Sequence, residues 1–432
     1  MTLLSFFGRK ELICLFQKTL MCLLVAFSID QTAWSLPNFA RKYNVPCASC
    51  HAAVPRLNPT GYKFRAAGYR MPNEMGQDAT TKKLEDYFSN QTQITAFFNA
   101  TRVENETKNT IVNKVDFVES VFYVGMGNWG KRLSTGTELT VNSTGKIDVE
   151  SAQARYLWGD NSHFHTLRVG IFHPLEGFGA ADRSIGISDP LFMSASSQRG
   201  PTDTLGTILA PSVAGFTLEG NRGNVNISLS LLNRASVVSE NGFALAKYFN
   251  SDATTRMGDF LGTVTYIYNS KGSGSGVTLY YYAGKSDIPI VTDNFVSRGA
   301  SPLYANTYQR AALFANYYLT SNLNILAGLG YGRDKSPPGL SADKTFESGG
   351  YFGALEYFFS PDMVVGTRYD LYQGDRKVQF SHGNTQTATL YVNWHLIPEL
   401  ILLGEYQYLY LASPGNSKVY NQSVKANLMF VF

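Results

Sequence analysis

Long apolar runs, charged residues and cysteines are all scarce in this chain of 432 residues. No uninterrupted apolar stretch reaches the roughly 18–20 residues that a membrane-spanning helix needs, which argues against a helical membrane protein. Charged residues make up only 16% of the chain, whereas aromatic residues make up 13% and glycine occurs 39 times. That mixture favours an all-β membrane protein.

Residues 1–35 have the three parts of a secretory signal peptide. Arg9, Lys10 and Lys18 form the positive flank, residues 20–27 the apolar region, and small residues stand at the expected cleavage site after Ser35. A retained N-terminal anchor helix is the alternative. Cleavage would leave 34 basic and 31 acidic residues, because Glu11 and Asp30 also leave, and the net charge would be +3. A charge this small does not indicate binding to nucleic acid.

The mature chain would keep only two cysteines, and both belong to the run Cys47-Ala48-Ser49-Cys50-His51. Cys-x-x-Cys-His is the attachment sequence of a c-type haem. The two thiols add to the two haem vinyl groups, and the adjacent imidazole becomes an axial ligand of the iron. A redox-active dithiol is one alternative. A zinc half-site is a weaker one, because no second cysteine pair exists.

Residues 36–78 form the predicted haem segment. Asn58 followed by proline is typical of a helix N-terminus, and we expect a short helix that ends near Ala67 and Gly68. Met71 precedes a proline and should be extended, so it is the first candidate for the sixth ligand of the haem iron, and Met75 is the second. Six basic residues accompany only two acids, Glu74 and Asp78, and they would face haem propionates, an anionic wall or solvent: Arg41, Lys42, Arg56, Lys63, Arg65 and Arg70.

Residues 90–432 repeat a pattern of about ten alternating residues followed by a turn. This pattern predicts an outer-membrane β-barrel of about 16 antiparallel strands. Alternation is clearest near the end, where Leu390 and Trp394 share one face while Tyr391, Asn393 and His395 share the other. The expected strands begin near residues 91, 114, 133, 146, 164, 207, 225, 257, 276, 307, 323, 348, 363, 385, 400 and 419.

The connections predict the orientation of the barrel. Short turns follow the even-numbered strands and long loops follow the odd-numbered ones, so the short turns and both chain ends should face the periplasm. The longest loop, 174–206, could fold inward as in general porins and place Asp182, Arg183 and Asp189 at a constriction, or these could be ordinary loop charges.

Carboxylates of other outer loops could bind a hard divalent cation or be solvated. His163 and His165 could share a face as a metal pair or as a polar pair near a turn.

The N-terminal segment resembles one known family. The matching residues are Phe39-Ala40-Arg41, Cys47-Ala48-Ser49-Cys50-His51, Leu57-Asn58, Gly61, Phe64 and Gly68-Tyr69. This run is similar to the outer-membrane fused monohaem cytochrome c–porins of the iron-oxidising type. The resemblance implies one covalently bound haem c in or under the barrel, extracellular Fe(II) as electron donor, and a periplasmic cytochrome c as acceptor.

Three functions remain open at this stage. The first is inward electron transfer, as an Fe(II):cytochrome c oxidoreductase in the bacterial outer membrane. The second is electron export to an extracellular acceptor, because sequence does not set the direction. The third is a solute channel with a haem-bearing plug.

Overall fold

The computed structural model places Pro37–Phe432 in one compact unit. It describes residues 38–431 except for 72–73, 76–92, 106–108, 143, 174, 183, 194–212, 234–256, 269–273, 289–303, 336–344, 374–383, 398 and 413–417. The expected signal peptide therefore lies outside the described residues, and its cleavage stays a prediction. None of the helices within these ranges is long and apolar enough to cross a membrane.

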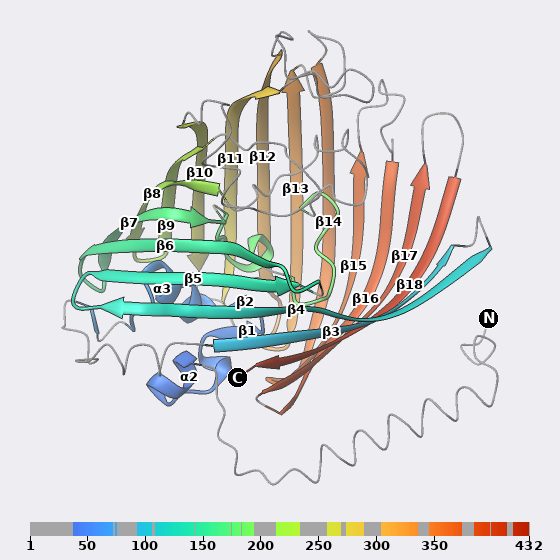
Figure 1. Ribbon diagram of the computed structural model, residues 1–432, viewed down its shortest axis with the longest axis horizontal. Helices are drawn as coiled ribbons and strands as arrows, with labels where there is room; N and C mark the ends of the chain where they lie inside the picture. The colour runs from blue at the N-terminus through green and yellow to red at the C-terminus, as the bar shows by residue number, and fades with distance from the viewer. Residues whose placement is uncertain are drawn as a thin grey trace. The chain divides into compact units, whose positions relative to one another are not determined.

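Sixteen of the described strands, β3 to β18, pair in antiparallel order and close into a barrel through the contact between β18 and β3 (Figure 1). Their bounds are β3 Gln93–Asn105, β4 Thr110–Trp129, β5 Leu133–Asn142, β6 Ile147–Gly159, β7 His163–Phe172, β8 Val213–Arg222, β9 Val225–Asn233, β10 Met257–Tyr268, β11 Ser275–Ile288, β12 Tyr304–Tyr318, β13 Leu323–Lys335, β14 Thr345–Ser360, β15 Met363–Gln373, β16 Asn384–Ile397, β17 Leu400–Ala412 and β18 Lys418–Val431. The predicted barrel of about 16 strands is confirmed. The largest error in a strand start is at β8, which begins six residues later than expected.

The two faces of each strand differ in polarity, as the alternation predicted. On β16, Leu390 and Trp394 are 53% and 39% exposed, whereas Tyr391 and Asn393 are 3% and 1% exposed. The outward face is apolar and the inward face carries polar groups, which is the arrangement of a transmembrane barrel with a polar lumen. Further outward-facing leucines are Leu229, Leu279, Leu329 and Leu355, and further buried hydroxyl residues are Thr265, Thr278 and Thr387.

Most connections differ in length between the two ends of the barrel. Residues 160–162, 223–224 and 361–362 are tight turns at one end, the short-turn end, whereas the connections 173–212 and 234–256 at the other end are long. The predicted alternation is confirmed for these connections, but 106–109 and 143–146 also follow odd-numbered barrel strands and are short, so the prediction of long loops there was wrong.

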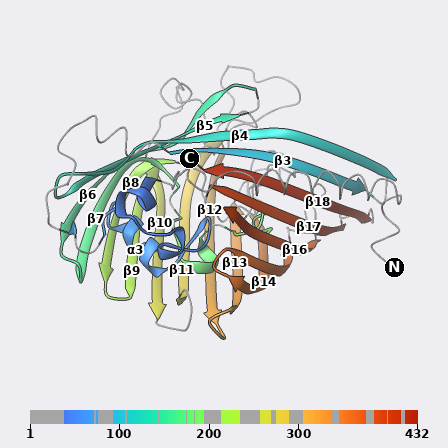
Figure 2. The same ribbon diagram turned by 90° about the horizontal axis from the view of Figure 1, so that it is seen from below.

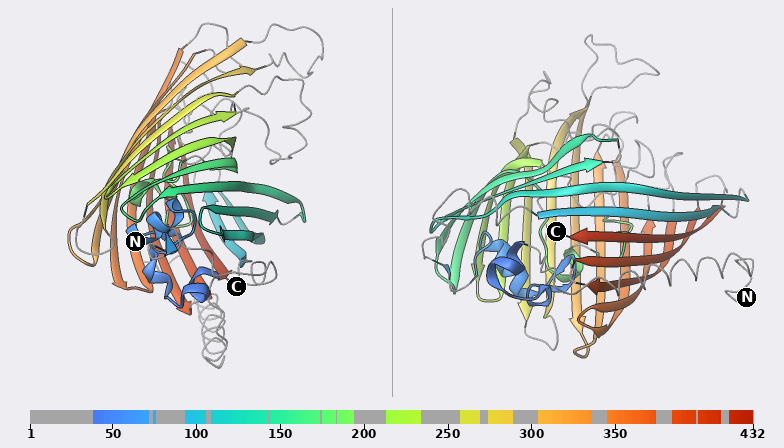
Figure 3. Two further views of the ribbon diagram at one scale, coloured as in Figure 1. Left: turned by 90° about the vertical axis from the view of Figure 1, so that its left-hand side faces the viewer. Right: turned by 60° about the horizontal axis from the view of Figure 1, so that its bottom comes forward.

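The N-terminal segment comprises helix α2 Asn38–Tyr43, the single 3-10 turn Cys47–Ser49, strands β1 His51–Ala53 and β2 Arg56–Leu57, and helix α3 Pro59–Ala66. Seen from below, this blue segment lies within the ring of strands (Figure 2). Both views in Figure 3 place it at the end of the barrel where β18 finishes. Val54 packs there against Ile401 and Val431, so the segment occupies the short-turn end.

Candidate haem-binding site

Residues 47–51, which we name the Cys turn, begin after Pro46, whose extended backbone (φ −68°, ψ 157°) starts the 3-10 turn. The backbone N–H of Cys50 donates to the Cys47 carbonyl at 3.0 Å, so the two residues stand one turn apart. Both thiols are free and half-buried. Burial raises the pKa of both thiols, whereas a redox-active dithiol depends on a lowered thiol pKa.

His51 starts the β1–β2 hairpin directly after the second cysteine. Its Nδ1 donates to the Pro55 carbonyl at 3.2 Å, which fixes the tautomer and makes Nε2 the nitrogen that could bind a metal. Burial lowers the pKa of His51 to about 4, an effect that Asp182 opposes and His395 assists. The imidazole is therefore neutral at neutral pH, as metal ligation requires. Two free thiols beside an oriented neutral imidazole fit the attachment of a haem c.

Asn58 joins the Cys turn to helix α3. Its Oδ1 accepts from the Gly61 N–H at 3.0 Å, which makes it the N-cap that the sequence predicted. Its Nδ2 donates to the carbonyls of Ala48 and Ser49, each at 3.1 Å, and its own N–H donates to the Cys50 carbonyl at 2.9 Å. One side chain thus orients both the helix and the two-residue gap between the cysteines. The helix ends at Ala66, close to the expected end.

Gly61 is required by the close approach of α3 to the Cys turn. A Cβ at this position would lie 2.1 Å from the Cys50 carbonyl oxygen, which is backbone and cannot move without the turn. We expect Gly61→Ala to destabilise the segment by about 1–3 kcal/mol and to lower the yield of covalently bound haem. The measurement is haem content per barrel in purified protein. Gly353→Ala is the matched control, because nothing lies within 4 Å of its Cβ; equal haem content in both variants would contradict the prediction.

A buried ion pair fastens the β1–β2 hairpin to the barrel wall. Arg56 Nη1 lies 2.6 Å from Glu356 Oε2 of β14, and the two side chains are only 7% and 0% exposed. Tyr391 and Asn324 donate to the same carboxylate at 2.8 and 3.0 Å. Because each carboxylate oxygen has a donor, the buried charge is compensated.

The loop after β7 folds into the lumen and forms the second anchor. Asp182 accepts from the Leu57 N–H at 2.9 Å and pairs with Arg65 at 3.4 Å. The Asp182 side chain is only 5% exposed, so it neither lines an open constriction nor behaves as a solvated loop charge. Its role is to hold the haem segment. Asp189 is exposed, and Arg183 lies outside the described residues.

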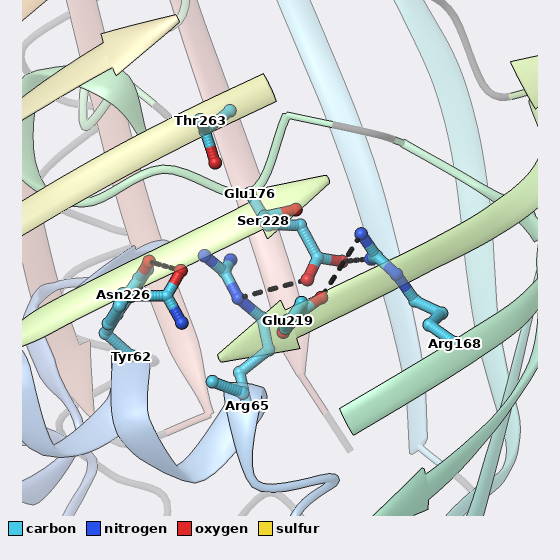
Figure 4. Close-up of a pocket in the computed structure, with 9 residues that line it drawn as sticks. Tyr62, Arg65, Arg168, Glu176, Glu219, Asn226, Ser228 and Thr263 are labelled. Carbon is cyan, nitrogen blue, oxygen red and sulfur yellow. Dashed lines mark hydrogen bonds and ion pairs between the residues drawn. The ribbon is translucent and has the colours of Figure 1, made fainter. Parts of the chain in front are cut away.

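Glu176 of the same loop lies among three arginines, two of which are seen with it in Figure 4. Its carboxylate is 3.7 Å from Arg65, 3.0 Å from Arg155 and 2.7 Å from Arg168. Burial alone would raise the pKa of Glu176, but the three guanidinium charges hold it well below its usual range. The anion therefore links helix α3 to strands β6 and β7.

These contacts decide the role of most of the basic residues in the segment. Arg56 and Arg65 pair with acids of the wall and the inward loop. Lys42 donates to Asn128 of β4 at 3.0 Å and lies 4.0 Å from Glu74. Arg70, 1% exposed, donates to the Leu133 carbonyl at 2.6 Å. The expected anionic wall is therefore found for Arg56, and Arg65 meets acids of the inward loop. Lys42 and Arg70 instead donate to uncharged acceptors of the wall.

The two methionine candidates occupy different surroundings. Met71 stands in a turn closed by Glu74, whose carboxylate accepts from the Met71 N–H at 3.1 Å. Met75 packs with Ala66, Leu157 and Phe164 between α3 and the wall. No measured contact tests ligation by either sulfur, so Met71 as sixth ligand stays a prediction.

His163 and His165 of β7 were the other candidates for a metal site. His163 and His165 are both exposed on one face of β7; His163 bonds Ser162 at 2.8 Å and His165 stacks on Trp158. Within the described ranges, no three His, Cys, Asp or Glu residues gather as a metal site.

Three comparisons place the barrel among known folds. No family model and no curated protein matches the chain. The anion-selective porin of Comamonas acidovorans matches with a TM-score of 0.53 and 11% identity, over 79% of this chain and 99% of that one. OprB of Pseudomonas putida matches at 0.52 and 11%, over 79% and 93%. The outer membrane channel DcaP of Acinetobacter baumannii matches at 0.50 and 10%, over 79% and 97%. The chain therefore has the fold of an outer-membrane porin.

Proposed function

We propose that this protein is an outer-membrane cytochrome–porin that takes electrons from extracellular Fe(II) and passes them to a periplasmic cytochrome c. One observation carries the proposal. A Cys-x-x-Cys-His turn lies within the lumen of a barrel with the porin fold, and buried ion pairs hold its segment there. Short turns face the periplasm in bacterial barrels, so the Cys turn would lie on the periplasmic side. The resemblance of residues 39–69 to the iron-oxidising cytochrome–porins adds the donor and the acceptor.

The protein's own residues would hold and shield the redox centre. Cys47 and Cys50 would hold the haem through thioether bonds, and His51 would supply a nitrogen to its iron. The Pro55 carbonyl fixes the orientation of that imidazole. When bound, haem c supplies a one-electron couple, which matches the oxidation of Fe(II) to Fe(III). Arg56 fastens the β1–β2 hairpin to the barrel wall, and Asp182 fastens it to the inward loop. One electron leaves each Fe(II), and one periplasmic cytochrome c is reduced.

Stopped-flow absorbance on the oxidised, purified protein mixed with Fe(II) tests this function. We expect reduced-haem bands to appear rapidly, with a rate that saturates as Fe(II) increases. Dithionite is the control, because it reduces any accessible haem. Reduction by dithionite but not by Fe(II) would exclude this donor and favour electron export or a different donor. Absence of any haem spectrum would remove the cytochrome function altogether.

A solute channel with a haem-bearing plug is the second candidate. The porin fold favours it, because its structural neighbours include an anion-selective porin and a channel. Ion conductance in planar bilayers separates the two. Electron transfer needs no open lumen, so low conductance with fast haem reduction supports the first function, and high conductance with slow reduction supports the second.

A further inference from the structure

A second histidine of the chain lies beside the Cys turn. His395 stands on β16, two residues beyond Asn393 and four beyond Tyr391, both of which face the lumen. Side chains alternate along a strand, so His395 faces the lumen as well. β16 runs toward the short turn at residue 399. His395 is therefore the inward-facing side chain nearest that end of the strand.

The haem segment docks on two of these inward positions of β16. Ala53 belongs to one apolar cluster with Tyr391, and the Val54 carbonyl accepts a hydrogen bond from Asn393 Nδ2 at 2.6 Å. His395 is the next inward position after Asn393, and its charge is among those that act on the His51 imidazole. His395 therefore lies one strand repeat from the wall residue that binds the hairpin of His51.

The surroundings of Cys47 give the same placement from the other side. Burial is the main cause of its raised thiol pKa, and the charges of Glu399 and Asp362 contribute. Asp362 also accepts the backbone N–H of His395 at 2.8 Å. His395 thus stands at the short turn that precedes β15, and Asp362 of that turn is among the charges that act on Cys47.

The ring of His395 presents a nitrogen that no protein group uses. Its Nε2 is buried and has no hydrogen-bond partner in the part of the chain that the structure describes. A buried polar atom without a partner is costly, and a missing ligand or ion is one of the recognised reasons for it. The register of β16 against β17 also shifts between His395 and Ile397. Such bulges redirect side chains next to functional sites.

We propose that His395 is the second axial ligand of the haem iron, opposite His51. This inference rests on the haem of the proposed function. It replaces Met71 as the first candidate, because His395 supplies a buried nitrogen without a partner among the described residues, on the wall two residues from the Asn393 that binds Val54. Two imidazoles give a lower potential than a His/Met pair. The assignment therefore predicts a midpoint potential below that of a His/Met haem.

Low-temperature EPR and near-infrared magnetic circular dichroism of the oxidised full-length protein test the ligand. We expect the wild type to be low-spin with the bands of two imidazoles. His395→Ala should become high-spin while its covalent haem content is unchanged, and added imidazole should restore the low-spin signal. His395→Met should stay low-spin, gain the band of a methionine–iron bond and rise in midpoint potential.

Met71→Ala and His165→Ala are the matched controls, because the first removes the rival ligand and the second an exposed histidine of β7. Neither should change the spectrum. A methionine–iron band in the wild type that Met71→Ala removes would overturn the proposal, and so would an unchanged low-spin spectrum in His395→Ala. Failure of the proposed function looks different: it shows as absent haem in the wild type, or as haem that Fe(II) does not reduce.

Discussion

Replacing Cys47 and Cys50 together by serine should yield an assembled barrel that carries no covalently bound haem. Thioether bonds to a haem would form only at these two sulfurs, because the mature chain would contain no other cysteine. The two-residue gap and Asn58 would stay in place, so the change removes attachment without removing the turn. Peroxidase staining of haem on a denaturing gel, with intact mass spectrometry of the same sample, measures the loss.

Two further variants make this result specific. Ala48→Ser replaces one of the two residues between the cysteines and leaves both thiols in place. Haem staining of this variant should equal that of the wild type. His51→Ala should abolish a functional haem site, with the barrel still in the membrane, because it removes the iron ligand and leaves the wall contacts. Haem staining that persists in the double serine variant would contradict attachment at the Cys turn. Loss of the barrel in His51→Ala would show that the segment and the barrel fold as one unit.

Arg56→Ala should destabilise the docked segment by about 3–5 kcal/mol. The substitution leaves the Glu356 carboxylate buried, at 0% exposure, without its counter-charge. Tyr391 and Asn324 can donate to it but cannot neutralise it. We expect the hairpin to leave the wall, which would raise ion conductance through the barrel and expose the Cys turn to protease. Single-channel conductance and limited proteolysis of the purified protein measure both effects.

The exposed pair Arg333–Glu347 supplies the matched control. Its side chains are 55% and 57% exposed, and surface pairs of this kind contribute about 0–1 kcal/mol, so Arg333→Ala should leave conductance and proteolysis unchanged. The double variant Arg56→Met with Glu356→Met removes both charges and should recover much of the lost stability. If the double variant is as damaged as Arg56→Ala, the stranded charge is not the cause.

The sequence predicted those features that repeat or that depend on neighbouring residues. Sixteen alternating segments specified the barrel, because each strand shows its two faces within ten residues. The N-cap at Asn58 could be predicted for a similar reason, because Asn58 and its partner Gly61 are only three positions apart. The Cys turn could be recognised as a candidate haem site because haem attachment demands a fixed spacing, and haem binding there stays a prediction.

The docking of the haem segment could not be predicted from the sequence, because it depends on contacts between residues far apart in the chain. The basic residues indicated a need for acids, but Arg56 could not be assigned to Glu356 rather than to any other carboxylate. Asp182 was placed in a long loop, and its burial follows only from the inward path of that loop. His395 was correctly placed on the inward face, yet alternation alone does not say what an inward residue meets.

The separation between Arg56 and Glu356 has a consequence for how the chain folds. Their partnership spans 300 positions, and that of Val54 with Asn393 spans 339. Contacts between distant positions form only after the entropy of closing the intervening chain has been lost, and proteins rich in them fold slowly. β14 and β16 are among the last strands of the chain, so the hairpin cannot dock fully until they are present. The N-terminal segment, although first in the sequence, is therefore among the last parts to reach its final position.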